Sequence, residues 1–298
     1  MQGVTLRQLE AFVAIVQGGT LSNAAEQLCL SKAAVSMTLN ELEKQLNCRL
    51  FERVRNRLQV NDQGRQLMPL ADEVLHRMQD IQTLFVCAAQ VQGTLRVGAS
   101  ASIGNYLLPA LLAGFRRQYP EVKLEAAINN TRTLGEMLEG FELDIALVEG
   151  QLSSANLAGH DWLGDQLLVI AAPDHPLARQ SSLCLGDLED QGWLLRESGS
   201  GSREQFHRLV GDRLLGWHSV LELNTTEALV NGVACGLGLC LISRLAVERA
   251  LADGRVVALD VDPPLHRRLK WVVHREKYQH PALASFIRYC AQWRRPGL

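Results

Sequence analysis

Residues 20–46 read TLSNAAEQLCLSKAAVSMTLNELEKQL and contain two helical patterns separated by a very short break. Apolar residues recur at helical spacing in the second pattern and predict one buried face: Val35, Leu39, Leu42 and Leu46. Ser31 stands where its hydroxyl can accept a hydrogen bond from a free amide of the first turn, as an N-cap does. Because only Cys29 and Leu30 lie between the helices, the sequence predicts a steep crossing, as in a helix-turn-helix.

A helical corner in any all-α subdomain would share these features, so the flanking sequence decides the interpretation. Before the pair, Thr5 to Gln17 predicts a helix that begins with capping-box spacing between Thr5 and Gln8. After it, residues 52–60 (ERVRNRLQV) alternate in character and predict a short hairpin, or wing, with Asn56 at its tip. Arginines on such a wing can reach phosphates, although a solvated charge run is the alternative.

A long helix is predicted next, from Asn61 or Asp62 to about Val91. Its apolar positions alternate steps of three and four, as in a coiled-coil seam: Leu67, Leu70, Val74, Met78, Ile81, Leu84 and Ala88. Such a seam on a helix between two domains predicts dimerisation, and a helix packed on its own chain is the alternative. Pro69 is expected to bend this helix because it lacks a backbone donor.

From Gly93 onward, alternating strands and helices predict parallel α/β sheets. The expected strands cover residues 94–97, 122–127, 143–148, 167–172, 193–196, 219–223, 239–242, 256–259 and 270–274. One helix is expected to run from the first of these strands through Gln118. The last strand and a helix over 281–293 are expected to return to the first lobe.

Composition narrows the functional classes. The formal net charge is −2 over 298 residues, so any DNA-binding surface must be a local patch. The seven cysteines form no C-x-x-C pair, which favours reduced thiols over disulfides or a zinc ribbon. Neither a signal peptide nor a membrane-spanning run is recognisable, so we expect a soluble, cytoplasmic protein without membrane partners. Catalytic and metal-ligand spacings are not found, so neither an enzyme, a cofactor nor a metal is expected.

The N-terminal motif A-A-x-x-L-x-x-S-x-x-A-V-S-x-x-x-x-x-L-E, followed by L-F-x-R, resembles that of LysR-type transcriptional regulators. The residues that carry this resemblance are Ala24, Ala25, Leu28, Ser31, Ala34, Val35, Ser36, Leu42, Glu43, Leu50, Phe51 and Arg53. The resemblance covers essentially the whole chain. Lys32 departs from the glutamine that the family usually has after the capping serine. Residues 100–109 and 196–203 look most like regulators of sulfur and carbon assimilation.

The resemblance implies an N-terminal winged helix-turn-helix, a long linker helix and a bilobal α/β effector domain similar to periplasmic binding proteins. The corresponding ranges are 1–61 for the DNA-binding domain, 62–91 for the linker and dimerisation helix, and 92–298 for the effector-binding domain. Lobe I would take about 92–164 and 268–298, and lobe II about 165–267. A homodimer or homotetramer is implied, bound to double-stranded DNA at half-sites about one helical turn apart, or a multiple of it.

Residues 31–40 are then expected to enter the major groove, with the first helix of the pair and the wing holding phosphates. The predicted DNA-binding residues are Thr20, Ser22, Ser31, Lys32, Ala33, Ser36, Met37, Arg53, Arg55 and Arg57. Lysine at position 32 can approach guanine O6 and N7 as a point charge.

Three hydroxyl-bearing turns follow predicted strands, where helix N-termini present free amides to ligands. They comprise Ser100, Ala101 and Ser102; Gly199, Ser200, Gly201 and Ser202; and Asn224, Thr225 and Thr226. Together they suggest a small anionic effector between the lobes, such as a sulfur oxyanion or a phosphorylated metabolite, although each turn alone could be a capped helix start. Glu149 ends a strand at the same edge and is either a discriminator for a protonated ligand or hinge structure.

Two alternatives remain open. Cys235 and Cys240 could make the protein a redox-responsive regulator, although glycines and leucines around them indicate structural thiols. The α/β part could instead be a cytosolic solute-binding receptor whose N-terminal helices only mediate assembly.

Overall fold

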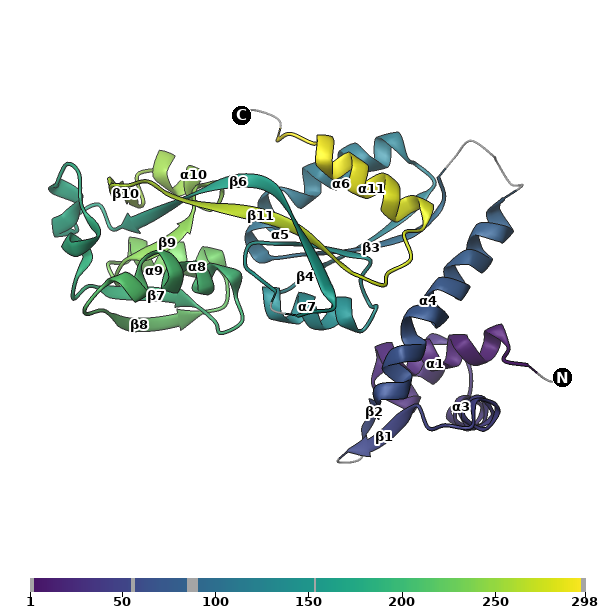
Figure 1. The fold of residues 1–298 in the computed structure, drawn as a ribbon. Helices are drawn as coiled ribbons and strands as arrows, with labels where there is room; N and C mark the ends of the chain where they lie inside the picture. Colours follow the sequence, from purple (N-terminus) through teal and green to yellow (C-terminus); the bar gives the residue numbers. More distant parts are fainter. Residues whose placement is uncertain (1–2, 55–56, 85–90, 153, 296–298) are drawn as a thin grey trace.

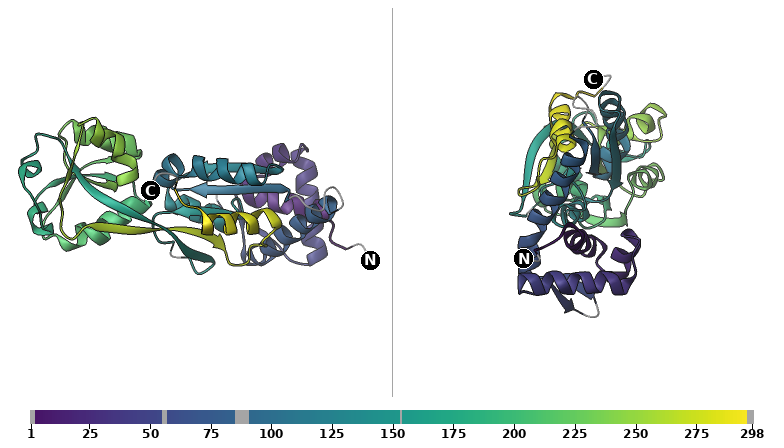
Figure 2. Two further views of the ribbon diagram at one scale, coloured as in Figure 1. Left: turned by 90° about the horizontal axis from the view of Figure 1, so that it is seen from above. Right: turned by 90° about the vertical axis from the view of Figure 1, so that its right-hand side faces the viewer.

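The computed structural model describes residues 3–54, 57–84, 91–152 and 154–295. The molecule is elongated, with an N-terminal head at one end, a first α/β lobe in the middle and a second lobe at the other end (Figures 1 and 2). Helix α4 leads from the head along the first lobe. The described helices lack the combination of length and apolar character that crossing a membrane requires.

The head contains three helices and a two-stranded hairpin: α1 (Leu6–Gly18), α2 (Leu21–Gln27), α3 (Lys32–Leu46), β1 (Phe51–Val54) and β2 (Arg57–Val60). The predicted capping box is confirmed, since Thr5 and Gln8 exchange side-chain-to-backbone hydrogen bonds. Ser31 caps α3 by accepting from the Ala34 amide at 3.1 Å. Cys29 takes a left-handed φ of 54° between α2 and α3, which makes the abrupt turn possible.

The core of the head is built by small and branched residues. Ala24 is fully buried, and its small side chain lets the helices approach closely. Val35, Leu39 and Leu42 are also buried, but Leu46 is 37% exposed. The prediction that Leu46 is buried was therefore wrong. It is the last residue of α3, after which the chain turns away at the left-handed C-cap Asn47.

Helix α4 (Asp62–Thr83) begins at the cap Asn61, as predicted, and Leu84 is its C-cap. The expected continuation to Val91, with Ala88, passes through residues that lie outside the described part. One face of α4 packs: Met68 and Ala71 join the core of the head. The opposite face leaves large apolar side chains exposed by 42 to 62%: Leu70, Val74, Ile81 and Leu84.

Lobe I contains β3 (Gly93–Ala99), α5 (Ala101–Tyr106), α6 (Leu108–Gln118), β4 (Val122–Ile128), α7 (Thr131–Glu139), β5 (Ile145–Val148) and α11 (Pro281–Gln292). Lobe II contains β7 (Gly192–Arg196), α8 (Gly201–Leu209), β8 (His218–Leu223), α9 (Thr226–Ala234), β9 (Cys240–Ser243), α10 (Arg244–Ala252) and β10 (Val257–Leu259). Three short 3-10 helices complete it: η1 (Pro176–Arg179), η2 (Leu185–Leu188) and η3 (Gly211–Arg213). The helix expected up to Gln118 is divided at Leu107.

Two long strands, β6 (Leu157–Ala171) and β11 (Leu265–His274), run through both lobes (Figure 1). They pair antiparallel, and β11 also pairs antiparallel with β5. The prediction of parallel sheets holds for β3 with β4 and β5, and for β7 with β8. For the seven-stranded sheet as a whole it was wrong, because the segments expected at 167–172 and 270–274 are the ends of these longer antiparallel strands.

Candidate nucleic-acid interface and inter-lobe cleft

The start of α3 presents exposed side chains of mixed character. Lys32 and Ala33 are exposed, Ser36 is half-buried, and Met37 is 64% exposed although it is a large apolar residue. On α2, Thr20 is the N-cap and accepts from the Asn23 amide at 3.1 Å, while Ser22 is exposed. Because the buried face of α3 faces the core of the head, this surface is available to a partner.

The wing follows α3 through a buried carboxylate. Glu43 accepts from the Leu50 amide at 2.8 Å and from Arg49 at 2.9 Å, so it fixes the turn from α3 into β1. Sequence reasoning included Glu43 in the motif but gave it no role. Arg53 and Arg57 lie on β1 and β2, whereas Arg55, like the tip Asn56, falls outside the described residues.

Between the lobes, the Glu149 carboxylate is buried and accepts three hydrogen bonds. The Ser102 amide of lobe I donates to Oε1 at 2.9 Å. The Ser202 hydroxyl of lobe II donates to Oε2 at 2.7 Å, and Arg267 Nη1 reaches the same oxygen at 3.0 Å. Glu149 is therefore not a bare carboxylate facing a ligand. It joins the two lobes.

Arg267 is the centre of this bridge, and sequence reasoning missed it. Its side chain is fully buried on β11, and its Nε donates to Asp165 on the adjacent β6 at 2.7 Å. Ser243, the cap of α10, donates to the other oxygen of Asp165 at 2.9 Å. A cation at the crossing strands thus connects residues from both lobes. The only signal in the sequence is an arginine among alternating apolar residues in LHRRLKWVV, at 265–273. This pattern is too common to identify a buried bridge by itself.

Burial and the charge of Arg267 shift the pKa values of the two carboxylates in the bridge. Burial alone would raise the pKa of Glu149, but Arg267 and the serine donors lower it to about 2. Burial outweighs the same guanidinium at Asp165, whose pKa is raised. The two carboxylates beside Arg267 therefore shift in opposite directions, Glu149 downward and Asp165 upward.

Backbone contact between the lobes depends on two glycines. A Cβ on Gly201 would lie 2.7 Å from the Gly150 nitrogen, and one on Gly150 would lie 2.9 Å from the Gly201 Cα. No larger residue fits this approach without displacement. Gly201, one of the residues predicted to bind the effector, thus brings the backbone close to the opposite lobe.

Beside this contact lies a pocket of about 480 Å³ with residues of both lobes in its wall: Thr131, Arg132, Gln151, Leu152, Ser198, Gly199, Ser200, Arg203, Glu204 and His207. Thr131 is 3% exposed, and its Oγ1 has no hydrogen-bond partner among the described residues. The pocket is also next to the start of α8, where backbone amides are free. Arg203 is already paired with Glu222 of β8, so Arg132 is the cation of the wall that favours a negatively charged guest.

The predicted effector residues divide into groups. Ser102, Glu149 and Ser202 are brought together, and Gly199 and Ser200 line the pocket. Ser100 is buried with an unpartnered hydroxyl, and Ala101 begins α5. Asn224 and Thr225 are exposed, Thr225 caps α9 and Thr226 is buried. No hydrogen bond in the described part joins this last turn to the other two.

Two family descriptions cover nearly the whole chain. Residues 6–65 match the bacterial regulatory helix-turn-helix protein of the LysR family, and residues 88–295 match the LysR substrate-binding domain. The chain belongs to the LysR family of transcriptional regulators.

LysR-type relatives align along the full length. The HTH-type transcriptional regulator YeiE of Escherichia coli is 38% identical, over 96% of this chain and 97% of its own. The RuBisCO operon transcriptional regulator of Allochromatium vinosum is 30% identical, over 95% and 94%. The chain is thus a LysR-type DNA-binding regulator with an effector-binding domain.

Solved LysR structures share the architecture. Full-length OxyR from Pseudomonas aeruginosa superposes with a TM-score of 0.77 at 25% identity, covering 98% of this chain and 94% of that one. The CcmR regulatory domain of Synechocystis in complex with 2-PG gives 0.62 at 27% identity, covering 67% and 96%. The winged head, long helix and two-lobed α/β domain expected from the sequence are confirmed.

The bridge predicts a pH-dependent stability in this LysR protein. Because the pKa of Glu149 is lowered on folding, its contribution is complete above about pH 4.5 and is lost as the pH falls toward about 2. Glu149→Gln should therefore reduce the free energy of unfolding by roughly 3 kcal/mol at neutral pH, with the difference shrinking below about pH 4.5. Urea unfolding followed by tryptophan fluorescence across pH measures this.

Glu121→Gln provides the matched control, since Glu121 is exposed before β4 and the charge change is the same. A difference between Glu149→Gln and the native chain that stays constant from neutral pH to pH 2 would contradict the assignment of this charge.

Proposed function

We propose that this LysR regulator is a homodimer, or a dimer of dimers, whose grip on DNA is set by a small anion bound between the lobes. The observation that carries the proposal is the inter-lobe pocket beside the Glu149 bridge, where basic side chains and an unpartnered buried hydroxyl meet. Residues 1–61 would form the DNA-binding domain, 62–91 the linker, and 92–298 the effector domain, with lobe II spanning about 165–267.

The exposed start of α3 supports the assignment of the DNA-reading surface. We place Lys32, Ala33, Ser36 and Met37 nearest the base edges, with Thr20, Ser22 and Ser31 at the backbone. The wing arginines Arg53, Arg55 and Arg57 would hold phosphates. These assignments rest on the sequence, on the position of the residues in the head and on the family.

Lys32→Ala is expected to change base preference at one position in each half-site, by about 1–3 kcal/mol of discrimination, because its ammonium approaches guanine acceptors. Lys44→Ala is the matched control: it removes the same exposed charge from the other end of α3. Binding to a randomised operator library, sequenced after selection at fixed salt, compares the two. Identical preferences for both variants would exclude Lys32 from base contact.

The exposed stripe on α4 supports dimerisation. Leu70, Val74, Ile81 and Leu84 follow the spacing of a coiled-coil seam, and burying them against a second copy would remove apolar surface from water. The packed face of the same helix is already used by the head, so the stripe is a separate surface.

Ile81→Glu should dissociate the dimer, because a carboxylate from each copy would be buried in the seam without a partner. Gln82→Glu adds the same charge at the next, exposed residue and should leave the assembly intact. Sedimentation equilibrium gives the mass of both variants. A dimer as stable with Ile81→Glu as with Gln82→Glu would remove the stripe from the interface.

An anion is favoured in the pocket for three reasons. Arg132 is an exposed residue of the pocket wall, and among the described residues its guanidinium makes one hydrogen bond, to Ser198 at 3.4 Å, so its charge can act on a guest. Thr131 offers a hydroxyl without a partner, and α8 offers free amides and the positive end of its dipole. In addition, 2-PG is bound by the related CcmR domain. Glu149 already occupies the Ser102 amide and the Ser202 hydroxyl, so the ligand would lie beside this bridge.

Sulfate, sulfite, inorganic phosphate and 2-PG are the probes for a thermal-shift titration. One of them should raise the melting temperature, since a ligand at about 100 times its Kd adds about 2.7 kcal/mol. Arg132→Gln should weaken that ligand about tenfold or more by removing a charge-assisted hydrogen bond. Arg179→Gln, which removes an exposed charge from η1, should not. A response restricted to cationic or aromatic compounds would refute the anion assignment.

The redox alternative is weaker. Burial raises the pKa of the Cys240 thiol to about 12, so it stays protonated and unreactive at neutral pH. Cys235 is exposed at the end of α9 and is free, as is Cys240. A solute receptor without DNA binding would not explain the exposed start of α3 or the family of residues 6–65.

A further inference from the structure

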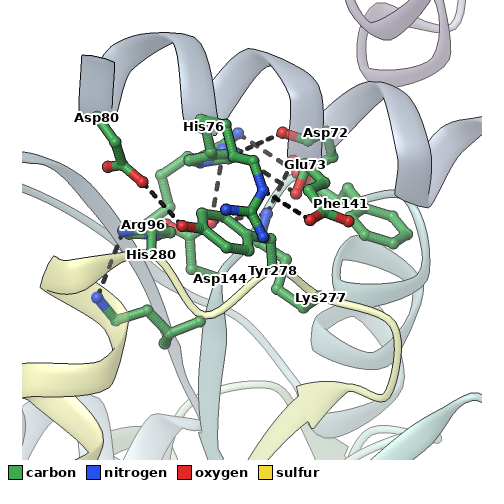
Figure 3. Close-up of polar contacts among 12 residues, drawn as sticks. Asp72, Glu73, His76, Asp80, Arg96, Phe141, Asp144, Lys277, Tyr278 and His280 are labelled. Atoms are coloured by element: carbon green, nitrogen blue, oxygen red, sulfur yellow. Dashed lines mark hydrogen bonds and ion pairs between the residues drawn. The ribbon is translucent and has the colours of Figure 1, made fainter. Parts of the chain in front are cut away.

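Helix α4 meets lobe I through a cluster of buried charges that the DNA-reading surface and the cleft do not use (Figure 3). We define the docking cluster as Asp72 and His76 of α4 together with Asp144, Lys277 and His280 of lobe I. Lys277 Nζ lies 2.9 Å from a carboxylate oxygen of Asp72 and 2.9 Å from one of Asp144. The three side chains are at most 2% exposed, so the ammonium joins two carboxylates away from water.

The cluster is close to electrically balanced. Arg96 adds a second cation, since its amide donates to Asp144 at 2.7 Å and its guanidinium lies 3.5 Å from the same carboxylate. Burial alone would raise the pKa of Asp144, but His280, Lys277 and Arg96 hold it well below its usual range. The pKa of Asp72 is also lowered, against its burial, by His76 and Lys277. Both carboxylates are therefore charged at neutral pH.

A metal ion is a poor occupant, although His76, Asp144 and His280 place ligand atoms within 4.8 Å of one another. His280 Nδ1 accepts from the Leu283 amide at 3.4 Å and is already engaged, while Nε2 faces Asp144 at 3.7 Å. The two imidazoles stack at 4.7 Å, and Lys277 together with Arg96 already balances the charge of the two carboxylates. The cluster is a contact between elements of the chain.

Two further contacts surround it. The Phe141 carbonyl accepts from Gln17 of α1 at 3.1 Å, and its ring, 2% exposed, packs into the core of the head. Phe141 has a left-handed φ of 55°, which is unfavourable for an aromatic residue and shows that the docked arrangement constrains this loop. On α4, Asp80 accepts from the Tyr278 hydroxyl at 2.9 Å, and Arg77 stacks 4.6 Å above the Tyr278 ring.

The strands of lobe I connect this contact to the cleft. Asp144 precedes β5 and Glu149 follows it, so the two carboxylates stand at opposite ends of one strand, roughly 17 Å apart by the strand rise. On the antiparallel neighbour β11, Arg267 lies at the cleft end, and Lys277 comes three residues after the strand ends at His274. The pairs Glu149–Arg267 and Asp144–Lys277 therefore lie toward opposite ends of the same two hydrogen-bonded strands.

We propose that the docking cluster is a positioning site that holds the head against lobe I. We also propose that β5 and β11 connect the formation of this contact to the Glu149–Arg267 bridge in the cleft. Its regulatory meaning rests on the proposed function. Loss of Lys277 would leave two carboxylates buried together. Asp72 regains water when α4 leaves lobe I, whereas Asp144 stays fixed before β5. Release of the helix is thus the least costly response, and the lobes stay folded.

Hydrogen exchange on the full chain tests the docking. Lys277→Met and Asp72→Asn should each speed exchange about tenfold or more at 72–80 and at 139–143, because both segments lose their contact. Lys270→Met is the matched control: Lys270 is on β11, and its partner Asp161, 3.7 Å away, is 64% exposed. All five tryptophans lie between 162 and 293, so the tryptophan bands of the near-ultraviolet circular dichroism spectrum report the lobes and should be unchanged.

If exchange at 72–80 and 139–143 is the same in Lys277→Met and Lys270→Met, the cluster does not hold the head. Loss of the tryptophan signal in both Lys277→Met and Asp72→Asn would also overturn the proposal, since the cluster would then be part of the folding of lobe I. For the connection, Glu149→Gln should speed exchange at 72–80. A change confined to the surroundings of Ser102 and Ser202 would refute transmission. Neither measurement uses DNA or effector, so failure of the proposed function is detected separately.

Discussion

The antiparallel pairing of β6 with β11 is the constraint on which the rest of the structure depends. The register runs from Leu157 opposite His274 to Leu167 opposite Leu265, so one pair of strands belongs to the sheets of both lobes. Because both strands cross, the lobes cannot separate without bending this ladder, and relative motion is restricted to a hinge. The same register places Arg267 directly opposite Asp165. The bridge that closes the lobes is thus built into the crossing itself.

Local chemistry predicted the head and the alternation of strands and helices. The capping box at Thr5 and the N-cap at Ser31 are short-range signals, and each led to the right element. The crossing strands were underestimated because LAGHDWLGDQ, at 157–166, is too polar to read as a strand without its partner. The buried ion pairs were even less predictable from the sequence. Arg267 and Glu149 are 118 positions apart, and Lys277 and Asp72 are 205 apart, so neither pairing leaves a local pattern.

Buried ion pairs of this kind are weak evidence for stability, since desolvating both partners costs about as much as their attraction returns. Buried ion pairs instead determine which packing of the lobes and of α4 can form. A cation placed at Arg267 accepts only a neighbour that brings a carboxylate within reach, and the same is true of Lys277 between Asp72 and Asp144. An apolar contact such as that of Phe141 with the head tolerates a small displacement. A buried ion pair does not, because displacement leaves a buried charge without its partner. The charges therefore define the register of the lobes and of α4, and the apolar cores supply most of the free energy.

Because charges set the packing of the lobes while apolar cores supply the stability, the binding free energy of a small ligand can change the packing without unfolding the protein. The anion that we propose for the pocket would lie next to the Glu149 bridge, so its charge would act on the balance between Glu149, Arg267 and Asp165 and leave the cores intact. A coupling of 1–3 kcal/mol is enough to shift a conformational equilibrium 5- to 150-fold, and a buried ion pair is of that order. Thermodynamic linkage makes any such coupling reciprocal: if an effector in the cleft alters the docking of α4 on lobe I by a given factor, docking alters the affinity of the cleft for the effector by the same factor. DNA, which fixes the heads of a dimer at set half-site spacing, would then act on the effector pocket as strongly as the effector acts on DNA.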